Sequence, residues 1–271
     1  MDVTRGGYYR HLKKAVNYDH LELIETVKEI AEAADNTYGS RRMKAALDTM
    51  GYPVSRNKAK RLMKEAGVHV KSRKKFKVTT DSNHAKPLFD NRLNRDFAHE
   101  GPNQACVQDI TYIWTQEGWL YLATVIDLYS RRVVGWSMGS RMTAQLVCDA
   151  LKMAIWQRRP DAGLIVHSDR GSQYASKAYG RLLKAQGFIG SMSRKGNCWD
   201  NAVAESFFGS LKQERVQWRH YQTRYEAQQD VMQYITMWYN SRRLHSYLGN
   251  MSPNQFEMEM LLPPLELQKT S

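Results

Sequence analysis

From Gln104 onward, strand-like and helix-like stretches follow one another in an order that strongly constrains the fold. Residues 105–116, 118–130 and 131–140 are rich in β-branched and aromatic side chains, and a glycine and a YSRR turn separate them. We expect these three stretches to form an antiparallel meander. The later periodicity predicts two more strands among three helices, in the order helix 143–157, strand 164–168, helix 176–187, strand 188–193 and helix 198–217. Such an order predicts an α/β domain.

The first 70 residues lack this alternation and predict an all-helical domain. Asp19 is a candidate N-cap for a first helix, and Ser40 and Ser55 are candidate N-caps for two more, separated by a break at Gly51 and Pro53. A helix, a short turn and a basic helix are typical of the helix-turn-helix motif, although a solvated helical hairpin is the alternative. The apolar face expected for the first helix consists of Leu21, Ile24, Val27, Ile30 and Ala34.

Positive charge is concentrated near the N-terminus. The chain of 271 residues has a formal net charge of +13, and residues 41–77 contain 13 Lys or Arg against two acids. This distribution indicates a polyanionic partner, most often nucleic acid. The candidate DNA contacts in this region are Arg41, Arg42, Arg56, Lys58, Lys60, Arg61, Lys64, Arg73, Lys74 and Lys75.

Composition also suggests domain boundaries. We expect a helical DNA-binding domain over 1–70, a linker over 71–103, an α/β core with C-terminal helices over 104–260 and a tail over 261–271. The linker starts strongly basic and then becomes polar, so either it follows DNA phosphates or it is a solvated, disordered segment.

Cysteine and hydropathy patterns exclude several classes of protein. The three cysteines are far apart and show no zinc-ligand spacing, which argues against a structural zinc site and a disulfide scaffold. No apolar run is long enough to span a membrane, and the N-terminus lacks the apolar centre of a signal peptide. These features predict a protein of the cytoplasm that does not use a membrane.

Three acids lie on elements suited to a metal site. Asp109 falls within the first strand, Asp169 ends the fourth strand, and Glu205 lies in the last long helix. Carboxylates on rigid elements are the ligands that Mg²⁺ requires for phosphoryl transfer. Asp127 and Asp200 are competing candidates, but a turn and a helix start directly after them favour capping roles.

Five linked stretches carry a resemblance to a known family. They are QDITYIW, LATVIDLYSRRVVGW, HSDRGSQYAS, SRKGNCWDNAVAESFFGSLKQE and WYNSRRLHSYLGNMSPNQF. Together they resemble the DDE transposases of bacterial insertion sequences, in particular the second-reading-frame (OrfB) product of the insertion-sequence-three type. The resemblance covers nearly the whole chain.

The resemblance implies a ribonuclease H-like (retroviral integrase-like) core that follows the helix-turn-helix domain in the sequence. It implies that Asp109, Asp169 and Glu205 are both catalytic residues and ligands of Mg²⁺, with two ions at the site and Mn²⁺ as a substitute. The implied activity is nicking at the ends of the element, followed by transfer of the 3′-hydroxyl into DNA. A nuclease of the same fold that does not join strands and a non-catalytic DNA-binding regulator are the alternatives.

The resemblance also implies partners. These are double-stranded DNA (terminal inverted repeats and target), further copies of the chain in an oligomer, and a first-reading-frame (OrfA) partner or fusion. The expected place of action is the bacterial cytoplasm, at the nucleoid.

Further positions have weaker support as DNA contacts. Arg170 and Gln173 lie beside one acid, Lys195 and Asn197 precede the helix of another, and the last stretch supplies Tyr239, Asn240, Arg242, Arg243 and His245. For these last five residues, support of the active-site helix is an equal alternative to DNA binding. We expect His167 to lie in the core, because it precedes Asp169 on the opposite face of its strand.

Overall fold

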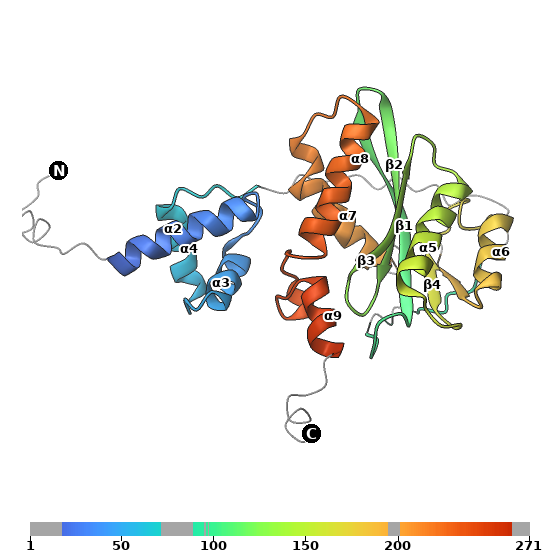
Figure 1. The fold of residues 1–271 in the computed structure, drawn as a ribbon, viewed down its shortest axis with the longest axis horizontal. Helices are drawn as coiled ribbons and strands as arrows, with labels where there is room; N and C mark the ends of the chain where they lie inside the picture. The colour runs from blue at the N-terminus through green and yellow to red at the C-terminus, as the bar shows by residue number, and fades with distance from the viewer. Residues whose placement is uncertain (1–17, 72–88, 95, 97, 195–200, 262–271) are drawn as a thin grey trace, which may run out of the picture. The chain divides into compact units, whose positions relative to one another are not determined.

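The structure is a computed structural model that describes residues 18–71, 89–94, 96, 98–194 and 201–261. The chain divides into two compact units, Met1–Lys71 and Ser72–Ser271, which are described one at a time (Figure 1). Among the described residues, no helix has the length and apolar character needed to cross a membrane.

The second unit is built on one five-stranded sheet. Its strands lie in the order β3-β2-β1-β4-β5, with the first three antiparallel and the last two added in parallel. The expected meander and the two later strands are therefore confirmed. The strands are β1 (Ala105–Thr115), β2 (Gly118–Asp127), β3 (Val133–Gly139), β4 (Ile165–Ser168) and β5 (Ile189–Met192).

Helices cover both faces of this sheet (Figure 1). One apolar cluster packs α5 (Ala144–Arg158) and α6 (Lys177–Ala185) against one face. A second cluster packs α7 (Ala202–Glu214) and α8 (Arg224–Gln233) against the other. Because side chains alternate along a strand, neighbouring residues such as Cys106 and Val107 contribute to opposite clusters.

The C-terminal segment continues from α8 without a break into a π-helix, η3 (Tyr234–Tyr239). It then forms the short helix η4 (Ser246–Leu248) and ends in α9 (Pro253–Leu261), while another short helix, η2 (Val216–Trp218), joins α7 to α8. The π-helix is a rare element that often occurs at functional sites.

Residues 18–71 of the first unit form three helices, α2 (Tyr18–Ala33), α3 (Ser40–Thr49) and α4 (Arg56–Glu65). The side chain of Ser55 accepts a hydrogen bond from the Lys58 amide, which confirms Ser55 as an N-cap.

Three other details expected of this unit are wrong. Asp19 lies inside the first turn of α2 rather than before it, because the helix begins one residue earlier. Ser40 is the first residue of α3, and Gly39 occupies the cap position. Leu21 is 49% exposed, and Leu23 takes its place on the buried face.

Part of the segment expected to be a linker packs on the core. Residues 89–94 lie against β5, where the Oγ of Ser191 accepts hydrogen bonds from the amides of Arg92 and Leu93 at 2.9 and 3.1 Å. Phe89 covers Gly190 so closely that a Cβ there would lie 2.8 Å from its ring. This edge of the sheet is therefore covered by chain that precedes the first strand.

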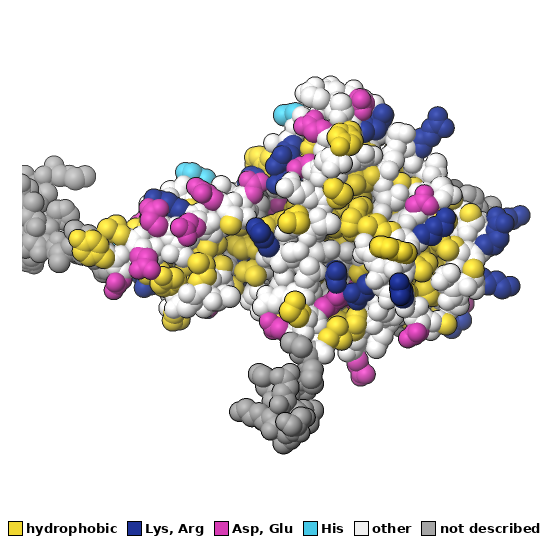
Figure 2. All heavy atoms as spheres, in the orientation of Figure 1, with side chains coloured by type: hydrophobic (Ala, Val, Ile, Leu, Met, Phe, Trp, Pro, Cys, Tyr) yellow, Lys and Arg dark blue, Asp and Glu magenta, His cyan; other side chains and the backbone are white. Residues whose placement is uncertain are grey.

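The surface of the core carries positive charge in addition to the basic N-terminal unit. On the face seen in Figure 2, Lys and Arg side chains gather over the part of the core that contains α5 and α6. Hydrophobic side chains lie between them on the same face.

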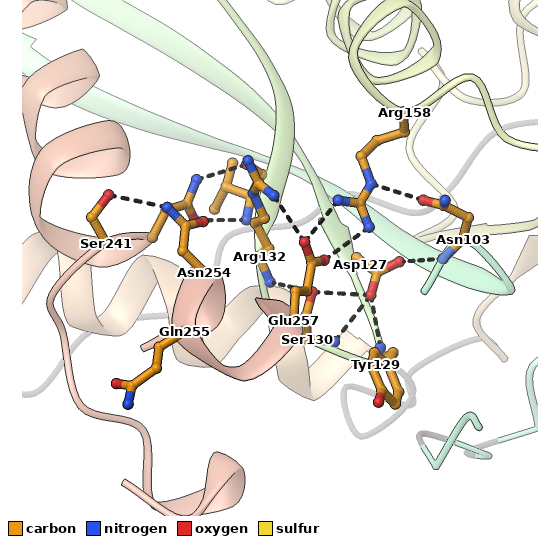
Figure 3. A network of polar contacts seen from close by, with 12 residues as sticks. Asn103, Asp127, Tyr129, Ser130, Arg132, Arg158, Ser241, Asn254, Gln255 and Glu257 are labelled. Carbon is orange, nitrogen blue, oxygen red and sulfur yellow. Dashed lines mark hydrogen bonds and ion pairs between the residues drawn. The ribbon is translucent and has the colours of Figure 1, made fainter. Parts of the chain in front are cut away.

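A polar network joins α9 to one end of the sheet (Figure 3). Glu257 accepts hydrogen bonds from Arg132 and Arg158, each at 2.8 Å. Beside it, Asp127 accepts from the amides of Tyr129 and Ser130 at 3.0 Å. Its other oxygen accepts from the Asn103 amide at 2.8 Å. The expected turn-capping role of Asp127 is confirmed, whereas Asp200 lies outside the described residues.

Candidate active site

Two of the three predicted acids lie next to each other, one on β1 and one directly after β4. β1 and β4 run parallel, and the last pair of residues in their register is Gln108 and Ser168. Asp109 is the next residue of β1, and Asp169 is the first residue after the end of β4. Because β4 ends here while β1 continues to Thr115, where a bridge to Tyr221 begins, the site lies beside a stretch of β1 that has no neighbouring strand on this side among the described residues; we call this stretch the open edge of β1.

Asp109 points to the face of the sheet that α7 covers. It has the same strand parity as Val107 and Ile113, which both belong to the apolar cluster beneath α7. Its carboxylate accepts a hydrogen bond from the Ile110 amide at 2.7 Å. The strand thus presents this carboxylate to the helix that carries Glu205.

Geometry explains why a glycine, Gly171, follows Asp169 by two residues. Oδ1 of Asp169 accepts a hydrogen bond from the amide of Gly171 at 2.9 Å. A Cβ on Gly171 would lie 2.9 Å from the same oxygen, so a larger residue would displace the carboxylate. The short turn after β4 therefore fixes the direction of the acid.

Glu205 lies in the first turn of α7, on an exposed position. Partial burial of its carboxyl group raises its pKa above the ordinary value. The pKa of Asp109 is raised well above its ordinary value, first by burial and then by the negative charges of Asp169 and Glu205. Asp169 and Glu205 therefore both lie within electrostatic range of Asp109.

In the described conformation, the three acids do not form a complete metal site. Among the residues that the structure places, no three Asp, Glu, His or Cys side chains are close enough together to hold a metal ion. The two aspartates are adjacent, and the third acid comes from the exposed start of a helix.

Sequence reasoning missed Lys212, which lies on α7 seven residues after Glu205. Residues seven apart share a helix face, so the spacing of Lys212 from Glu205 could have indicated that both side chains lie on the same side of the helix. The Lys212 ammonium lies 4.8 Å from the centre of the Tyr112 ring. Burial lowers the pKa of Lys212, and the charge of Asp109 offsets part of this effect, so the cation lies near Asp109.

Some of the other DNA contacts predicted near the acids belong to the described part of the chain, and some do not. Nε of Arg170 donates to the Ser193 carbonyl at 2.7 Å, and the Gln173 side-chain amide donates to the Met142 carbonyl at 3.3 Å. Lys195, Asn197, Arg73, Lys74 and Lys75 lie outside the described residues.

The predicted contacts of the N-terminal unit are mostly at its surface. Arg41 is exposed, and Arg42 is half-buried with its guanidinium 5.6 Å from the centre of the Tyr38 ring. The cations of α4 are all exposed, namely Arg56, Lys58, Lys60, Arg61 and Lys64.

His167 lies in the core, as expected, and is fully buried. Its Nδ1 is 2.9 Å from the Ser191 hydroxyl, and its Nε2 is 3.1 Å from the Ser193 hydroxyl. Since two backbone amides already donate to Ser191, the proton of that hydroxyl is directed to Nδ1. The imidazole is therefore a structural group that ties β4 to β5.

Arg243 is buried rather than presented to solvent. Its side chain is 6% exposed and forms an ion pair of 2.7 Å with Glu214 on α7. Of the two roles considered for this residue, the geometry supports the structural one. Asn240 is also structural, because its side chain exchanges hydrogen bonds with the backbone of Val133, whereas Arg242 is exposed.

Comparison with known proteins identifies the family. Residues 99–198 and 205–261 match families described as "Integrase core domain", and residues 19–76 match an "HTH-like domain". The chain is 47% identical over 270 residues to "Transposase InsF for insertion sequence IS3A" of Escherichia coli, covering 96% of this chain and 92% of the relative. The chain belongs to the family of IS3 transposases.

A second relative of this IS3 transposase is the "Insertion element IS600 uncharacterized 31 kDa protein" of Shigella sonnei. The two are 45% identical over 258 residues, which cover 94% of each chain. As a transposase with an integrase core, the chain is a nucleotidyl-transferring enzyme.

Solved structures support the fold. The transposase matches a chain in a cryo-EM structure of the simian T-cell lymphotropic virus intasome with a TM-score of 0.51 and 16% identity. The match covers 82% of this chain and 72% of that one. The expected ribonuclease H-like, integrase-like core is confirmed.

Proposed function

We propose that this transposase nicks DNA at the ends of its insertion sequence and transfers the resulting 3′-hydroxyl into target DNA. The observation that carries the proposal is the meeting of Asp109 and Asp169 at the open edge of β1, on the side to which α7 brings Glu205. No step needs a covalent bond between protein and DNA, because a hydroxyl group attacks the phosphate directly.

We infer that the site takes divalent cations, two Mg²⁺ ions with Mn²⁺ as a substitute. The donor set fits them, because all three groups are hard carboxylate oxygens. The raised pKa of Asp109 also fits, since burial and the neighbouring negative charges leave its charged form poorly stabilised without a cation. When bound, such ions supply Lewis-acid stabilisation of the attacking and leaving oxygens.

The residues of the chain have separable roles in this proposal. Asp109, Asp169 and Glu205 hold the cations, and the Gly171 turn keeps one of these carboxylates in its direction. Lys212, on the same face of α7 as Glu205, supplies positive charge for a DNA phosphate beside the acids.

The N-terminal unit provides most of the DNA affinity in this proposal. Its last helix, α4, carries five exposed cations and is held against the unit by its buried residues Ala59, Leu62 and Met63. A rigid basic helix of this kind suits contacts with double-stranded DNA. Binding at the terminal inverted repeats would bring the core to the cleavage site.

The proposed assembly contains more than one copy of the chain, because two DNA ends must be joined to one target. It includes a first-reading-frame partner or fusion, as the resemblance implies. We place its action at the nucleoid, where the DNA substrate is found.

An assay with end-labelled terminal-repeat DNA and a target plasmid tests this function. The proposal predicts Mg²⁺-dependent nicks and joined products, and it predicts that Asp109→Asn removes both while DNA binding survives. Free ends without joined product would support a nuclease of the same fold. Full activity of Asp109→Asn would contradict the assignment of the site.

A further inference from the structure

We propose that Arg243 is a positioning residue that fixes α7, and with it Glu205 and Lys212, in the catalytic position. The inference rests on the proposed function, because it concerns the helix that carries one of the three acids. It assigns a role to the buried ion pair behind that helix.

Arg243 binds α7 at two places. Nε and Nη2 donate to the two carboxylate oxygens of Glu214 at 2.9 and 2.7 Å, and Nη2 also donates to the Ser210 hydroxyl at 2.9 Å. Ser210 and Glu214 are four residues apart and therefore lie on one face of the helix. A contact to one residue would leave the helix free to turn, whereas contacts to both resist rotation as well as sliding.

The face that Arg243 binds lies opposite the catalytic face. Glu214 follows Glu205 by nine residues, which is about two and a half helical turns and places the two on opposite sides of α7. Lys212 follows Glu205 by seven residues and shares its face. Any rotation of α7 that the rear contacts permit is therefore transmitted directly to the acid and the lysine.

The N-terminal end of α7 shows no side-chain capping in the described structure, because the N-cap residue Asn201 makes no such hydrogen bond. At the C-terminal end, the backbone amide of Arg215 donates to the Leu211 carbonyl. Glu214 carries its negative charge in the last turn, where the helix dipole disfavours it. That position is explained by the tertiary ion pair rather than by the stability of the helix.

The π-helix η3 also contacts the face of α7 that Arg243 binds. The Tyr234 hydroxyl and the Trp238 indole donate to Oε2 of Glu214 at 2.8 and 3.3 Å. Tyr239 packs edge-on against Phe207 of α7, with ring centres 4.7 Å apart. The wider turn of a π-helix lets residues four and five apart share a face, so all three aromatic rings reach α7.

The burial of the ion pair distinguishes positioning from DNA contact. The Arg243 and Glu214 side chains are each 6% exposed. Burial lowers the pKa of Arg243, but the charge and hydrogen bonds of Glu214, together with Tyr234 and Tyr239, outweigh this effect and raise it, so the guanidinium stays charged. A phosphate could reach this cation only after the helix had moved.

The test compares full-length variants Arg243→Gln and Glu214→Gln with Arg158→Gln, which breaks a buried pair at the far end of the sheet. For the first two we expect a fall in kcat for nicking of roughly tenfold to a hundredfold, with unchanged DNA affinity and salt dependence. Hydrogen exchange without metal or DNA should be faster in the amides of α7. Arg158→Gln should change neither kcat nor exchange in α7, and Arg243→Lys should recover part of the rate.

Unchanged kcat and unchanged α7 exchange in Arg243→Gln would overturn the inference. So would weaker DNA binding with a flatter salt dependence in Arg243→Gln but not in Glu214→Gln, because that result indicates direct contact with phosphate. If either Gln variant fails to fold, Ser210→Ala removes one of the two attachments alone and should still accelerate exchange near residue 210; unchanged exchange would contradict the inference. Activity of Asp109→Asn, measured alongside, reports separately on the proposed function.

Discussion

Two groups of buried or half-buried acids in the same core have opposite electrostatic surroundings. At the end of the sheet near α9, Glu257 and Asp127 receive hydrogen bonds from arginine side chains and backbone amides (Figure 3). Burial raises the pKa of Glu257, but hydrogen bonds from Arg158, Ser130 and Arg132 outweigh it and lower the pKa. At the open edge of β1, burial and like charge raise the pKa of Asp109.

This difference separates structural acids from functional ones. An acid whose charge is met by donors of its own chain stabilises the fold, and removing it costs stability. An acid crowded with other acids makes the fold less stable and is retained because it binds something that the chain lacks. Burial and residue type alone do not distinguish the two groups, whereas their partners do.

The largest expected effect comes from changing one aspartate of each group to asparagine. Asp109→Asn should raise the activation free energy of nicking and joining by several kcal/mol, which lowers the rate on the order of 10³-fold or more. Asp127→Asn should leave the rate of the folded enzyme unchanged. End-labelled DNA assays under single-turnover conditions measure both.

The same two variants should move stability in opposite directions. Because the folded-state pKa of Asp109 lies above its unfolded value, the folded core binds more protons in the intervening range and loses stability as the pH rises. Asp109→Asn should therefore raise the free energy of unfolding at neutral pH without metal. Asp127→Asn should lower it by about 1–3 kcal/mol, because an amide hydrogen replaces an acceptor. Urea titrations measure both, and equal shifts in the two variants would break the comparison.

A second prediction concerns Glu257. Glu257→Ala should cost about 3–5 kcal/mol of unfolding free energy, since two arginines lose their buried partner. Because its folded-state pKa is lowered, the stabilisation from Glu257 is present above its ordinary value of 4.5 and is lost as the pH falls below it. Urea titrations at pH 7 and pH 4 should show a smaller difference between variant and parent at the lower pH. A constant difference would contradict the pairing.

A third prediction uses metal binding. Mn²⁺ or Mg²⁺ at 100 times its Kd should stabilise the parent by about 2.7 kcal/mol. It should not stabilise Asp109→Asn to the same extent, whereas Asp127→Asn should respond as the parent does. Thermal denaturation with and without the ion measures this. If Asp109→Asn were stabilised as much as the parent, Asp109 would not be a metal ligand, and the contrast between the two groups of acids would be lost.

The smallest expected effect lies in the N-terminal unit, whose charges are exposed rather than buried. Replacing Arg56, Lys58 and Arg61 by Ala should weaken DNA binding roughly tenfold and flatten the log–log salt slope by about 0.9 for each phosphate that the variant no longer neutralises. Nicking of saturating DNA should be unaffected. An unchanged salt slope would contradict the role of α4.

Much of the fold could be predicted because its signals are local. The alternation of strand and helix patterns predicted the five strands of the core and their order along the chain, and Ser55 indicated the start of α4. The expected start of α2 lies two residues after the observed one and that of α3 one residue after it, because several neighbouring polar residues could each begin the helix. The buried face of α2 shifted from Leu21 to Leu23.

The pairing of buried charges could not be predicted. Arg243 and Glu214 are far apart in sequence, and each alone has the composition of a surface residue. Their pairing depends on the path of the chain through η3, and a π-helix has no signal in hydrophobic periodicity. Lys212 could have been found from its spacing to Glu205.

The most direct test of the account is the position of metal at the site. Crystals of the chain with a terminal-repeat DNA end and Mn²⁺ should show anomalous scattering peaks ligated by Asp109, Asp169 and Glu205 together. Peaks elsewhere, or a Glu205 carboxylate more than roughly 10 Å from both aspartates in the DNA complex, would contradict the central claim.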